Sequence, residues 1–343
     1  MQKKKVGIVS GGFTSEYNIS ILSGKTVFEE LDRKLWEVYL INITESEWKA
    51  EDDQNNIYEV NKGDFTLQNN ETLINLDVIF NAVHGAPGEN GQLAALWELL
   101  KIPFTSCDSY TAGLTYNKRD CLSVLRELKV PTAKYFSINK GAPINENLIL
   151  ATVELPCFVK ANRAGSSHGV FKVTTKNELI PSIEKAFEED SQVIIESALE
   201  GREVSVGVAS FQGGVHVLPI TEIVTNNDFF DYAAKYEGKS QEITPAQIPN
   251  KWKQLVEHWA KSIYVTLDLK GVVRSEFIFV NGIPHLLEVN TNGLNIFNFN
   301  GAIADIDGEL LLEDPGRSDW GFMTKHLNES DKTSNFNDGL SFK

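Results

Sequence analysis

Four polar side chains alternate along two apolar segments near residue 280. Arg274 and Glu276 lie in the first segment, Glu288 and Asn290 lie in the second, and Asn281-Gly282 separates them. Apolar segments around an Asn-Gly pair are typical of a β-hairpin. Side chains alternate between the faces of a strand, so a two-residue loop would place Glu276 and Glu288 on opposite faces. A three-residue loop that begins at Asn281 instead predicts Glu276 opposite Glu288, and Arg274 opposite Asn290.

This register would place two carboxylates and an amide on one patch. Close carboxylates repel each other unless a cation lies between them. Two glutamates and an asparagine offer only hard oxygen ligands, which suit Mg²⁺ held together with substrate phosphates. The alternative is a hairpin at the sheet surface whose charges are solvated, and the hairpin alone leaves both interpretations open.

A second segment has the composition of a phosphate-binding loop. The apolar residues 157–159 end at Lys160, and the following loop contains Gly165, Ser166, Ser167 and Gly169. Glycines allow backbone N–H groups to approach a polyphosphate, hydroxyl groups donate hydrogen bonds, and lysine supplies positive charge. The lysine precedes the glycines, so the segment is not a Walker A motif.

Two further loops follow apolar segments near the N-terminus. Ser10-Gly11-Gly12 follows residues 5–9, and His84 opens a glycine-rich loop, residues 84–91, after residues 76–83. Loops at the carboxyl ends of strands are where α/β sheets bind ligands. His84 is therefore a candidate site residue, with a structural hydrogen bond as the alternative. Glu16, near a predicted helix start, could simply complement the helix dipole.

Two other polar features have two interpretations each. Glu196 and Glu203 flank a turn, where they are either surface residues or contacts for a ribose or an adenine. The aromatic and charged segment 228–236 is either a mobile lid or a packed loop.

Periodicity predicts the elements that position these residues. Segment 44–75 is polar and predicts loops and short edge strands. The pattern elsewhere predicts strands at residues 5–9, 36–43, 76–83, 157–160, 192–196 and 203–209, and helices from residue 15 and at 92–100, 118–128, 179–187 and 251–267. Strand, glycine turn and helix in this order indicate an α/β fold.

Composition restricts the classes of partner and the cellular location that we expect for this protein. The chain has 343 residues, of which 42% are hydrophobic and 23% charged, as expected for a globular protein. Its formal charge of −15 argues against a nucleic-acid partner, whereas a nucleotide needs only a local positive pocket. Three widely spaced cysteines form no metal motif or disulfide framework. Without a signal-peptide pattern or an apolar segment long enough to span a membrane, we expect a cytoplasmic protein.

Together these stretches resemble the D-alanine–D-alanine ligases of the ATP-grasp superfamily, over residues 5 to about 295. The resemblance rests on motifs that occur in one order: Ser10 to Ser20, Val83 to Gly91, Asn117-Lys118, Val159 to Gly169, Glu196 to Glu203, Asp231 to Tyr236, and Arg274 to Thr291. It implies a three-domain ATP-grasp fold of the α/β (α+β) class. The expected parts are an N-terminal Rossmann-like (preATP-grasp) domain at 1–108, a central subdomain at 109–205, and a C-terminal subdomain with an acidic tail at 206–343.

The resemblance also implies an activity. Family members use ATP to join two D-alanines for peptidoglycan precursor synthesis, through an acyl phosphate. It implies two Mg²⁺ ions, or Mn²⁺ in their place, with Glu276 and Glu288 holding one ion and Glu288 and Asn290 holding the other. The family's habit also suggests a homodimer.

Further residue roles follow from the resemblance alone. For ATP, the implied residues are Lys118, Lys160 and Lys235 at the phosphates, with donors from Ser166 and Ser167, Glu203 at the ribose and Glu196 beside the adenine. For the amino-acid substrates, they are Glu16, Ser166 and Tyr236 as a hydrogen-bonded trio that closes the lid and orients the first D-alanine, His84 beside the substrates, and Arg274 with the Gly293 N–H at the oxyanion.

The sequence departs from the family pattern near its C-terminal end. Glu276 stands where family members usually have Asp. After Asn290-Thr291 the expected Pro is absent, and Asn298-Phe299 takes the place of the Ser-Leu pair that receives the second substrate. The expected C-terminal helix is not recognisable either. A ligase with a different second substrate, or a non-catalytic nucleotide-binding relative, therefore stays open as an alternative.

Overall fold

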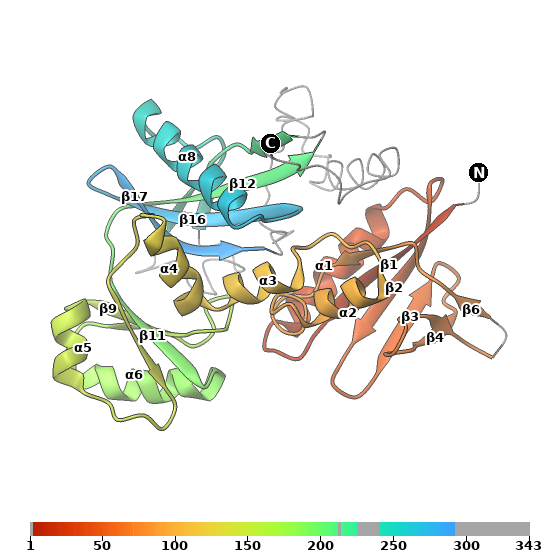
Figure 1. Cartoon of the computed structure of the whole chain (residues 1–343), viewed down its shortest axis with the longest axis horizontal. Coiled ribbons are helices and arrows are strands. Elements are labelled where there is room, and N and C mark those ends of the chain that lie inside the picture. Colours follow the sequence, from red (N-terminus) through yellow and green to blue (C-terminus); the bar gives the residue numbers. More distant parts are fainter. Residues whose placement is uncertain (1–2, 71, 212–213, 226–239, 292–343) are drawn as a thin grey trace.

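A computed structural model describes residues 3–70, 72–211, 214–225 and 240–291. Within these ranges three β-sheets follow one another along the chain, and helices pack against each of them (Figure 1). The mixed α/β class predicted from periodicity is confirmed.

The first sheet has parallel strands at one end and an antiparallel meander at the other. Strand β1 lies between β2 and β7 and runs parallel to both, and strands β2 to β6 then pair in sequence order. The strands are β1 (Lys4–Gly11), β2 (Trp36–Ile43), β3 (Trp48–Asp52), β4 (Ile57–Val60), β5 (Leu67–Gln68), β6 (Leu73–Ile74) and β7 (Val78–Asn81). The short edge strands predicted within residues 44–75 are therefore present.

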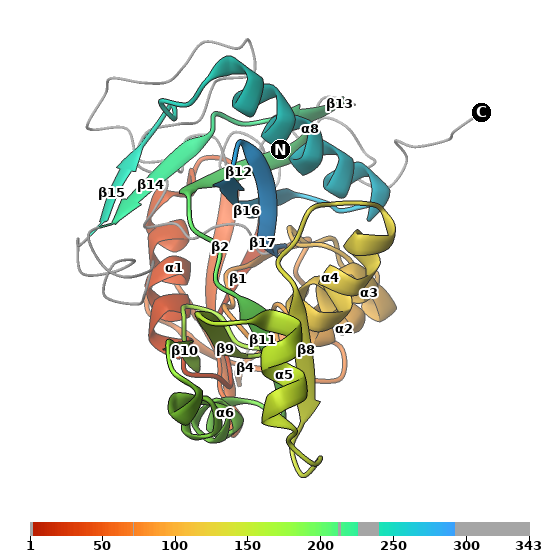
Figure 2. The same ribbon diagram turned by 90° about the vertical axis from the view of Figure 1, so that its left-hand side faces the viewer.

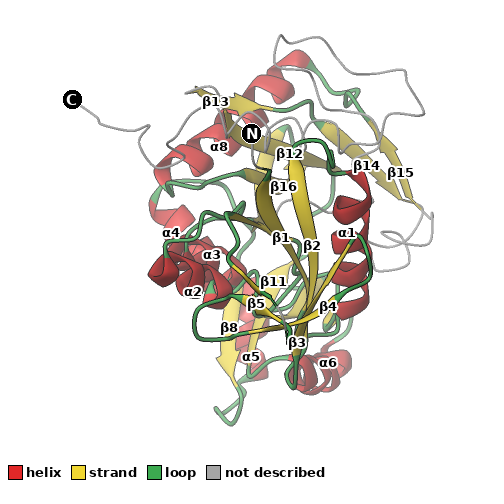
Figure 3. Ribbon diagram, turned by 90° about the vertical axis from the view of Figure 1, so that its right-hand side faces the viewer, coloured by secondary structure: helices red, strands yellow, loops and turns green. Residues whose placement is uncertain are grey.

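Two helices cover opposite faces of this sheet (Figure 3). Helix α1 (Tyr17–Glu30) buries Val27 in one apolar cluster, whereas α2 (Gln92–Leu100) buries Trp97 in the cluster on the other face. The carboxyl ends of β1 and β7 lead into the loops that contain Glu16 and His84.

The second sheet is antiparallel, in the order β10-β9-β11-β8. Helices α5 and α6 pack on it around a separate apolar cluster (Figure 2). The elements are β8 (Tyr135–Asn139), α5 (Glu146–Val153), β9 (Cys157–Ala161), β10 (Val170–Val173), α6 (Lys176–Glu189) and β11 (Gln192–Ser197). Lys160 lies near the end of β9, and the predicted phosphate loop connects β9 to β10.

The third sheet contains the polar hairpin. Its order is β15-β14-β12-β16-β17, with β13 paired to β12, and helix α8 packs against it. The elements are β12 (Arg202–Phe211), β13 (Gly214–Val217), β14 (Thr221–Thr225), β15 (Ser240–Ile243), α8 (Asn250–Thr266), β16 (Val272–Val280) and β17 (Ile283–Asn290).

Helices α3 (Ser109–Tyr116) and α4 (Lys118–Glu127) join the first sheet to the second in sequence but pack on the third. Ala112 of α3 and Leu122 of α4 belong to the apolar cluster that also contains Val204 and Phe277 of the third sheet. Helix α4 was predicted, whereas α3 and α5 were not. Each of these two missed helices has eight residues, too few to show a clear helical period.

The first and third sheets also share an apolar cluster. Val6 and Phe80 of the first sheet contact a cluster that includes Ala209 and Val272. The division into domains at 1–108, 109–205 and 206–343 stays a prediction; its second boundary falls inside β12. Among the described residues, no helix is long and apolar enough to cross a membrane.

Candidate functional site

The hairpin loop has two residues rather than the predicted three, yet Glu276 and Glu288 face each other. Strands β16 and β17 pair directly on either side of Asn281-Gly282. The register then shifts by one residue, because Glu276 pairs with Glu288 whereas the next residue of β16 pairs with Leu286. Leu287 is thus the extra residue of a β-bulge, which changes the facing of every later side chain. The loop prediction was wrong, and the predicted facing of the side chains is confirmed.

The hairpin patch contains both signs of charge. Arg274 lies opposite Asn290 in the register, and its guanidinium contacts the carboxylate of Glu276. Glu276 is only 4% exposed. On the second strand, the Asn290 amide donates to Glu288 Oε1 at 3.3 Å. The protein therefore offsets one glutamate with its own arginine, while the other glutamate faces the start of α4.

Lys118 lies between the hairpin and the predicted phosphate loop. Its Nζ is 3.7 Å from Glu288 Oε2 and donates to the backbone carbonyl of Ala164 at 2.5 Å. It occupies the first turn of α4, where the helix dipole also favours a bound anion. Lys118 therefore brings positive charge to a point that the third sheet and the loop share.

Lys160 forms a buried ion pair with Glu196 on the neighbouring strand β11. Their side-chain atoms Nζ and Oε2 are 2.7 Å apart, and Glu196 is 4% exposed. Burial alone would lower the pKa of Lys160, but Glu196, Glu288 and Glu203 raise it above its ordinary value. Lys160 therefore stays charged although it is enclosed. Glu203, on β12, pairs in the register with Ile278 of the hairpin strand.

The phosphate loop reaches the N-terminal sheet through Ser166. Its hydroxyl donates to Glu16 Oε1 at 2.6 Å, and Glu16 is 4% exposed. Ser166 and Ser167 adopt left-handed backbone angles, with φ of 49° and 60°. A Cβ added to Gly165 would lie 2.6 Å from Glu16 Oε1. The sequence-predicted residues Glu16 and Ser166 are thus in contact, and this contact requires glycine at position 165.

His84 is buried at the carboxyl end of the first sheet. Its Nε2 is 3.0 Å from the hydroxyl of Ser23, and it is 6% exposed. Burial, and then the nearby Arg274, lowers the pKa of His84 to about 4. The imidazole is therefore neutral near pH 7, and it can donate or accept a hydrogen bond there without adding charge.

Glu89 is a residue to which the sequence analysis assigned no role, although it lies inside the glycine-rich loop. Burial, and then the charges of Glu16 and Glu288, raises the pKa of Glu89 to about 8. A carboxyl group that holds its proton near neutral pH can act as a hydrogen-bond donor. The spacing of the loop contains no signal of this, because the two charges that repel Glu89 come from distant parts of the chain.

The hairpin residues fit a divalent metal by their chemistry. Glu276 and Glu288 face each other across adjacent strands, Asn290 follows on the same face, and all three present oxygen atoms. Among the described residues no group of three or more His, Cys, Asp or Glu could hold a metal ion. The predicted set contains only two carboxylates, so phosphate oxygens and water would have to complete the coordination.

Part of the predicted site falls outside the described residues. Lys235 and Tyr236, the whole lid segment 228–236, Gly293 and Asn298-Phe299 lie outside the described residues, so their placement stays a prediction. The remaining sequence-predicted residues come from all three sheets, from loops that follow their strands and from the first turn of α4.

Two family models match the chain. The model described as the N-terminus of D-Ala D-Ala ligase matches residues 5–107, and the model of the C-terminus matches residues 124–295. A D-alanine–D-alanine ligase from Christiangramia forsetii is 51% identical over 290 residues, which are 84% of this chain and 89% of that protein.

Solved structures agree with this similarity. The VanG D-Ala:D-Ser ligase from Enterococcus faecalis has a TM-score of 0.72 at 29% identity and covers 85% of this chain and 91% of its own. A Bacillus anthracis D-alanine–D-alanine ligase complexed with ATP has a TM-score of 0.67 at 26% identity, over 84% and 86%. The predicted ATP-grasp fold is confirmed.

Proposed function

Because the chain belongs to the D-alanine–D-alanine ligase family, we propose that it joins two D-alanines to D-alanyl-D-alanine for peptidoglycan precursor synthesis. The enzyme is an ADP-forming, carbon–nitrogen bond-forming ligase. The observation that carries this function is the position of Lys118, which contacts both Glu288 of the hairpin and the carbonyl of Ala164 in the phosphate loop. Lys118 thus places a positive charge where the hairpin and the phosphate loop meet.

A carboxylate is a weak electrophile, so the reaction begins by activating the carboxylate of the first D-alanine. The carboxylate oxygen of the first D-alanine attacks the γ-phosphate of ATP, which gives an acyl phosphate and ADP. Lys118 and Lys160 bind the phosphates and spread the charge that develops on the transferred group. Ser166 and Ser167 donate from the loop, and Lys235 joins them. Glu196 lies beside the adenine and Glu203 holds the ribose.

The hairpin would hold the metal. Glu276, Glu288 and Asn290 would bind two Mg²⁺ ions, or Mn²⁺, which would supply a Lewis acid that neutralises phosphate charge. Meanwhile Arg274 and Lys118 offset the charges of the two glutamates within the protein itself.

The second step forms the amide. The amine of the second D-alanine attacks the acyl phosphate through a tetrahedral intermediate, which then releases phosphate. Arg274 and the Gly293 N–H stabilise the oxyanion. Glu16 and Ser166, with Tyr236, orient the first D-alanine and close the lid, which excludes water that would hydrolyse the acyl phosphate. A neutral His84 contacts the substrates.

The second substrate is open to one alternative. Asn298-Phe299 replaces the Ser-Leu pair of the family pattern, and VanG, which resembles this chain, is named as a D-Ala:D-Ser ligase. A ligase that accepts another amine in the second position is therefore the second candidate, and a non-catalytic nucleotide-binding relative is the third. The proposed location of the protein is the cytoplasm, and its proposed oligomeric state is a homodimer. Its proposed partners are small molecules rather than nucleic acid or a membrane.

The test combines the protein with ATP, Mg²⁺ and D-alanine and measures released phosphate and the dipeptide by mass spectrometry. Equal amounts of both, lost in Glu288→Gln and retained in Glu200→Gln, support the proposal, because Glu200 is exposed in the loop between β11 and β12. Phosphate without dipeptide points to another amine, which a D-serine assay would detect. Bound ATP without phosphate release would contradict the ligase activity.

A further inference from the structure

Asn162 lies where the second sheet meets helix α4. It directly follows β9, two residues after Lys160, and it is 1% exposed. A buried asparagine must find partners for its carboxamide, since an unsatisfied buried polar group is costly. Its partners show what it holds in place.

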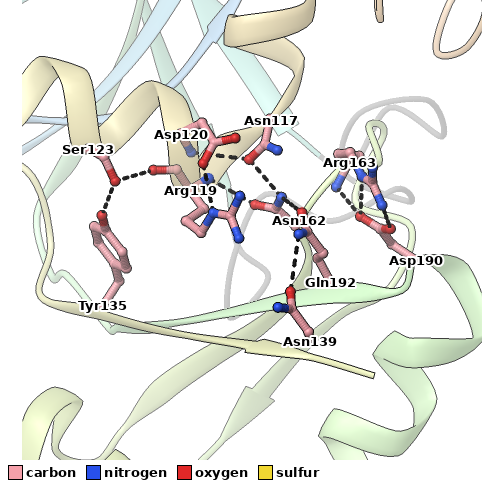
Figure 4. Close-up of polar contacts among 10 residues, drawn as sticks. All are labelled: Asn117, Arg119, Asp120, Ser123, Tyr135, Asn139, Asn162, Arg163, Asp190 and Gln192. Carbon is pink, nitrogen blue, oxygen red and sulfur yellow. Dashed lines mark hydrogen bonds and ion pairs between the residues drawn. The ribbon is translucent and has the colours of Figure 1, made fainter. Parts of the chain in front are cut away.

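Asn162 caps the beginning of α4 from a different part of the chain (Figure 4). Its backbone carbonyl accepts from the Lys118 N–H at 3.2 Å, and its Oδ1 accepts from the Arg119 N–H at 2.8 Å. The first N–H groups of a helix have no partner within the helix itself. The side chain of the N-cap residue Asn117 accepts from the third of these groups, the Asp120 N–H, at 3.1 Å. Asn162 therefore satisfies two backbone donors that the local cap does not reach.

The amide group of Asn162 completes the connection. Its Nδ2 donates to Asn117 Oδ1 at 2.7 Å and to Gln192 Oε1 at 3.0 Å. Its backbone N–H donates to the Gln192 carbonyl at 3.0 Å. Gln192 in turn donates to Asn139 at 3.1 Å, so the side chain of Asn162 has one preferred orientation (Figure 4).

The two lysines that this connection joins are supported by separate cores. Lys160 is on β9, and the preceding residue of this strand, Val159, packs in the apolar cluster of the second sheet. Lys118 is on α4, whose Leu122 packs in the cluster of the third sheet. Their spacing therefore depends on contacts between these two bodies, and Asn162 supplies three hydrogen bonds directly to the first turn of α4 and its cap.

We propose that Asn162 is a positioning residue that holds Lys118 and Lys160 at the spacing that a nucleotide polyphosphate requires. This inference rests on the proposed function, in which both lysines bind ATP. Asn162 touches neither substrate; it acts through the start of α4. Loss of its carboxamide leaves Lys118 free to shift relative to Lys160, which weakens phosphate binding more than amino-acid binding.

The central experiment compares three variants in full-length protein. Asn162→Ala removes the side-chain contacts to α4, and Gln192→Ala removes only the partner that orients the Asn162 amide. Asn139→Ala is the matched control, because it removes an amide from the same network on the side away from α4. The measurements are KM for ATP, KM for D-alanine, kcat, and the affinity for Mg²⁺·ADP by calorimetry.

Asn162→Ala should raise KM for ATP and the ADP dissociation constant about tenfold, which corresponds to about 1.4 kcal/mol. Gln192→Ala should raise them about threefold, Asn139→Ala by less than twofold, and KM for D-alanine should change by less than threefold in all three. A merely structural cap would lower the melting temperature and leave both constants unchanged, because neither depends on the fraction of folded protein.

Unchanged ATP and ADP constants in Asn162→Ala overturn the inference. If that variant does not fold, an unchanged constant in Gln192→Ala overturns it instead. A different result would contradict the proposed function: a wild-type protein that binds ADP but releases no phosphate with D-alanine. In that case the ADP titrations of the variants still test the role of Asn162.

Discussion

The contact between the phosphate loop and Glu16 can be tested by one methyl group. In Gly165→Ala the new Cβ would lie 2.6 Å from Glu16 Oε1 and 2.7 Å from Oε2, whereas ordinary contacts begin at 3.4 Å. No positive φ is involved at this glycine, so the effect is steric. Glu16 must withdraw by roughly 0.8 Å, which the buried surroundings of its carboxylate resist.

That displacement disrupts the hydrogen bond that Ser166 donates to Glu16 at 2.6 Å. A hydrogen bond to a charged group contributes about 2 kcal/mol, which corresponds to a roughly 30-fold lower kcat/KM for D-alanine. The assay is phosphate release at varied D-alanine and saturating ATP. Gly63→Ala is the control, because Gly63 is exposed and its added Cβ would approach only Asn61 Oδ1, at 3.3 Å.

A second substitution separates crowding from general damage. Glu16→Asp shortens the carboxylate by one methylene, so Gly165→Ala combined with Glu16→Asp should lose less activity than the two single effects together predict. The reasoning is refuted if Gly165→Ala stays within twofold of wild type, or if Gly63→Ala is equally impaired.

Two further predictions concern ionisable groups that folding encloses. Lys160→Met leaves Glu196 without its cation and should lower the free energy of unfolding by about 3 kcal/mol in urea titrations. Adding Glu196→Gln to this variant should restore stability but not the KM for ATP. Recovery of both would contradict a phosphate role for Lys160. The pKa of His84 falls from 6.5 to about 4 on folding, so the unfolded chain takes up a proton first as the pH falls. The contribution of His84 to the free energy of unfolding should therefore be present above pH 6.5 and be lost below it. Between pH 7 and pH 5 this loss should amount to about 2 kcal/mol. His84→Gln should reduce the pH dependence of urea unfolding by that amount, and an unchanged slope would show that His84 does not titrate as inferred.

Much of the site was predictable because its residues are close in sequence to recognisable elements. The alternation of Arg274 and Glu276, then of Glu288 and Asn290, depends only on the two-residue period of strands. Lys160 at the end of an apolar strand, followed by glycines and serines, has the same local character. These patterns place side chains on one face or in one loop, which is as far as local geometry extends.

The register of the hairpin shows where local reasoning stops. The facing of Glu276 and Glu288 was predicted correctly, but from a three-residue loop that the structure does not contain. A bulge at Leu287 supplies the missing residue instead. A bulge and a longer loop each add one residue to the hairpin, so both place the same side chains on the same face of the sheet. The alternation of polar and apolar residues along the chain therefore cannot distinguish them.

Local sequence patterns were enough to predict a mixed α/β fold, a hairpin with paired carboxylates, a phosphate loop and membership of the ligase family. Which of these groups come into contact depends on how the three sheets pack together. Asn162 caps a helix that begins at Lys118, and the charges that raise the pKa of Glu89 come from Glu16 and Glu288. The physical reason is that burial and electrostatic interaction depend on distances in space, and these pairs are separated by many residues along the chain.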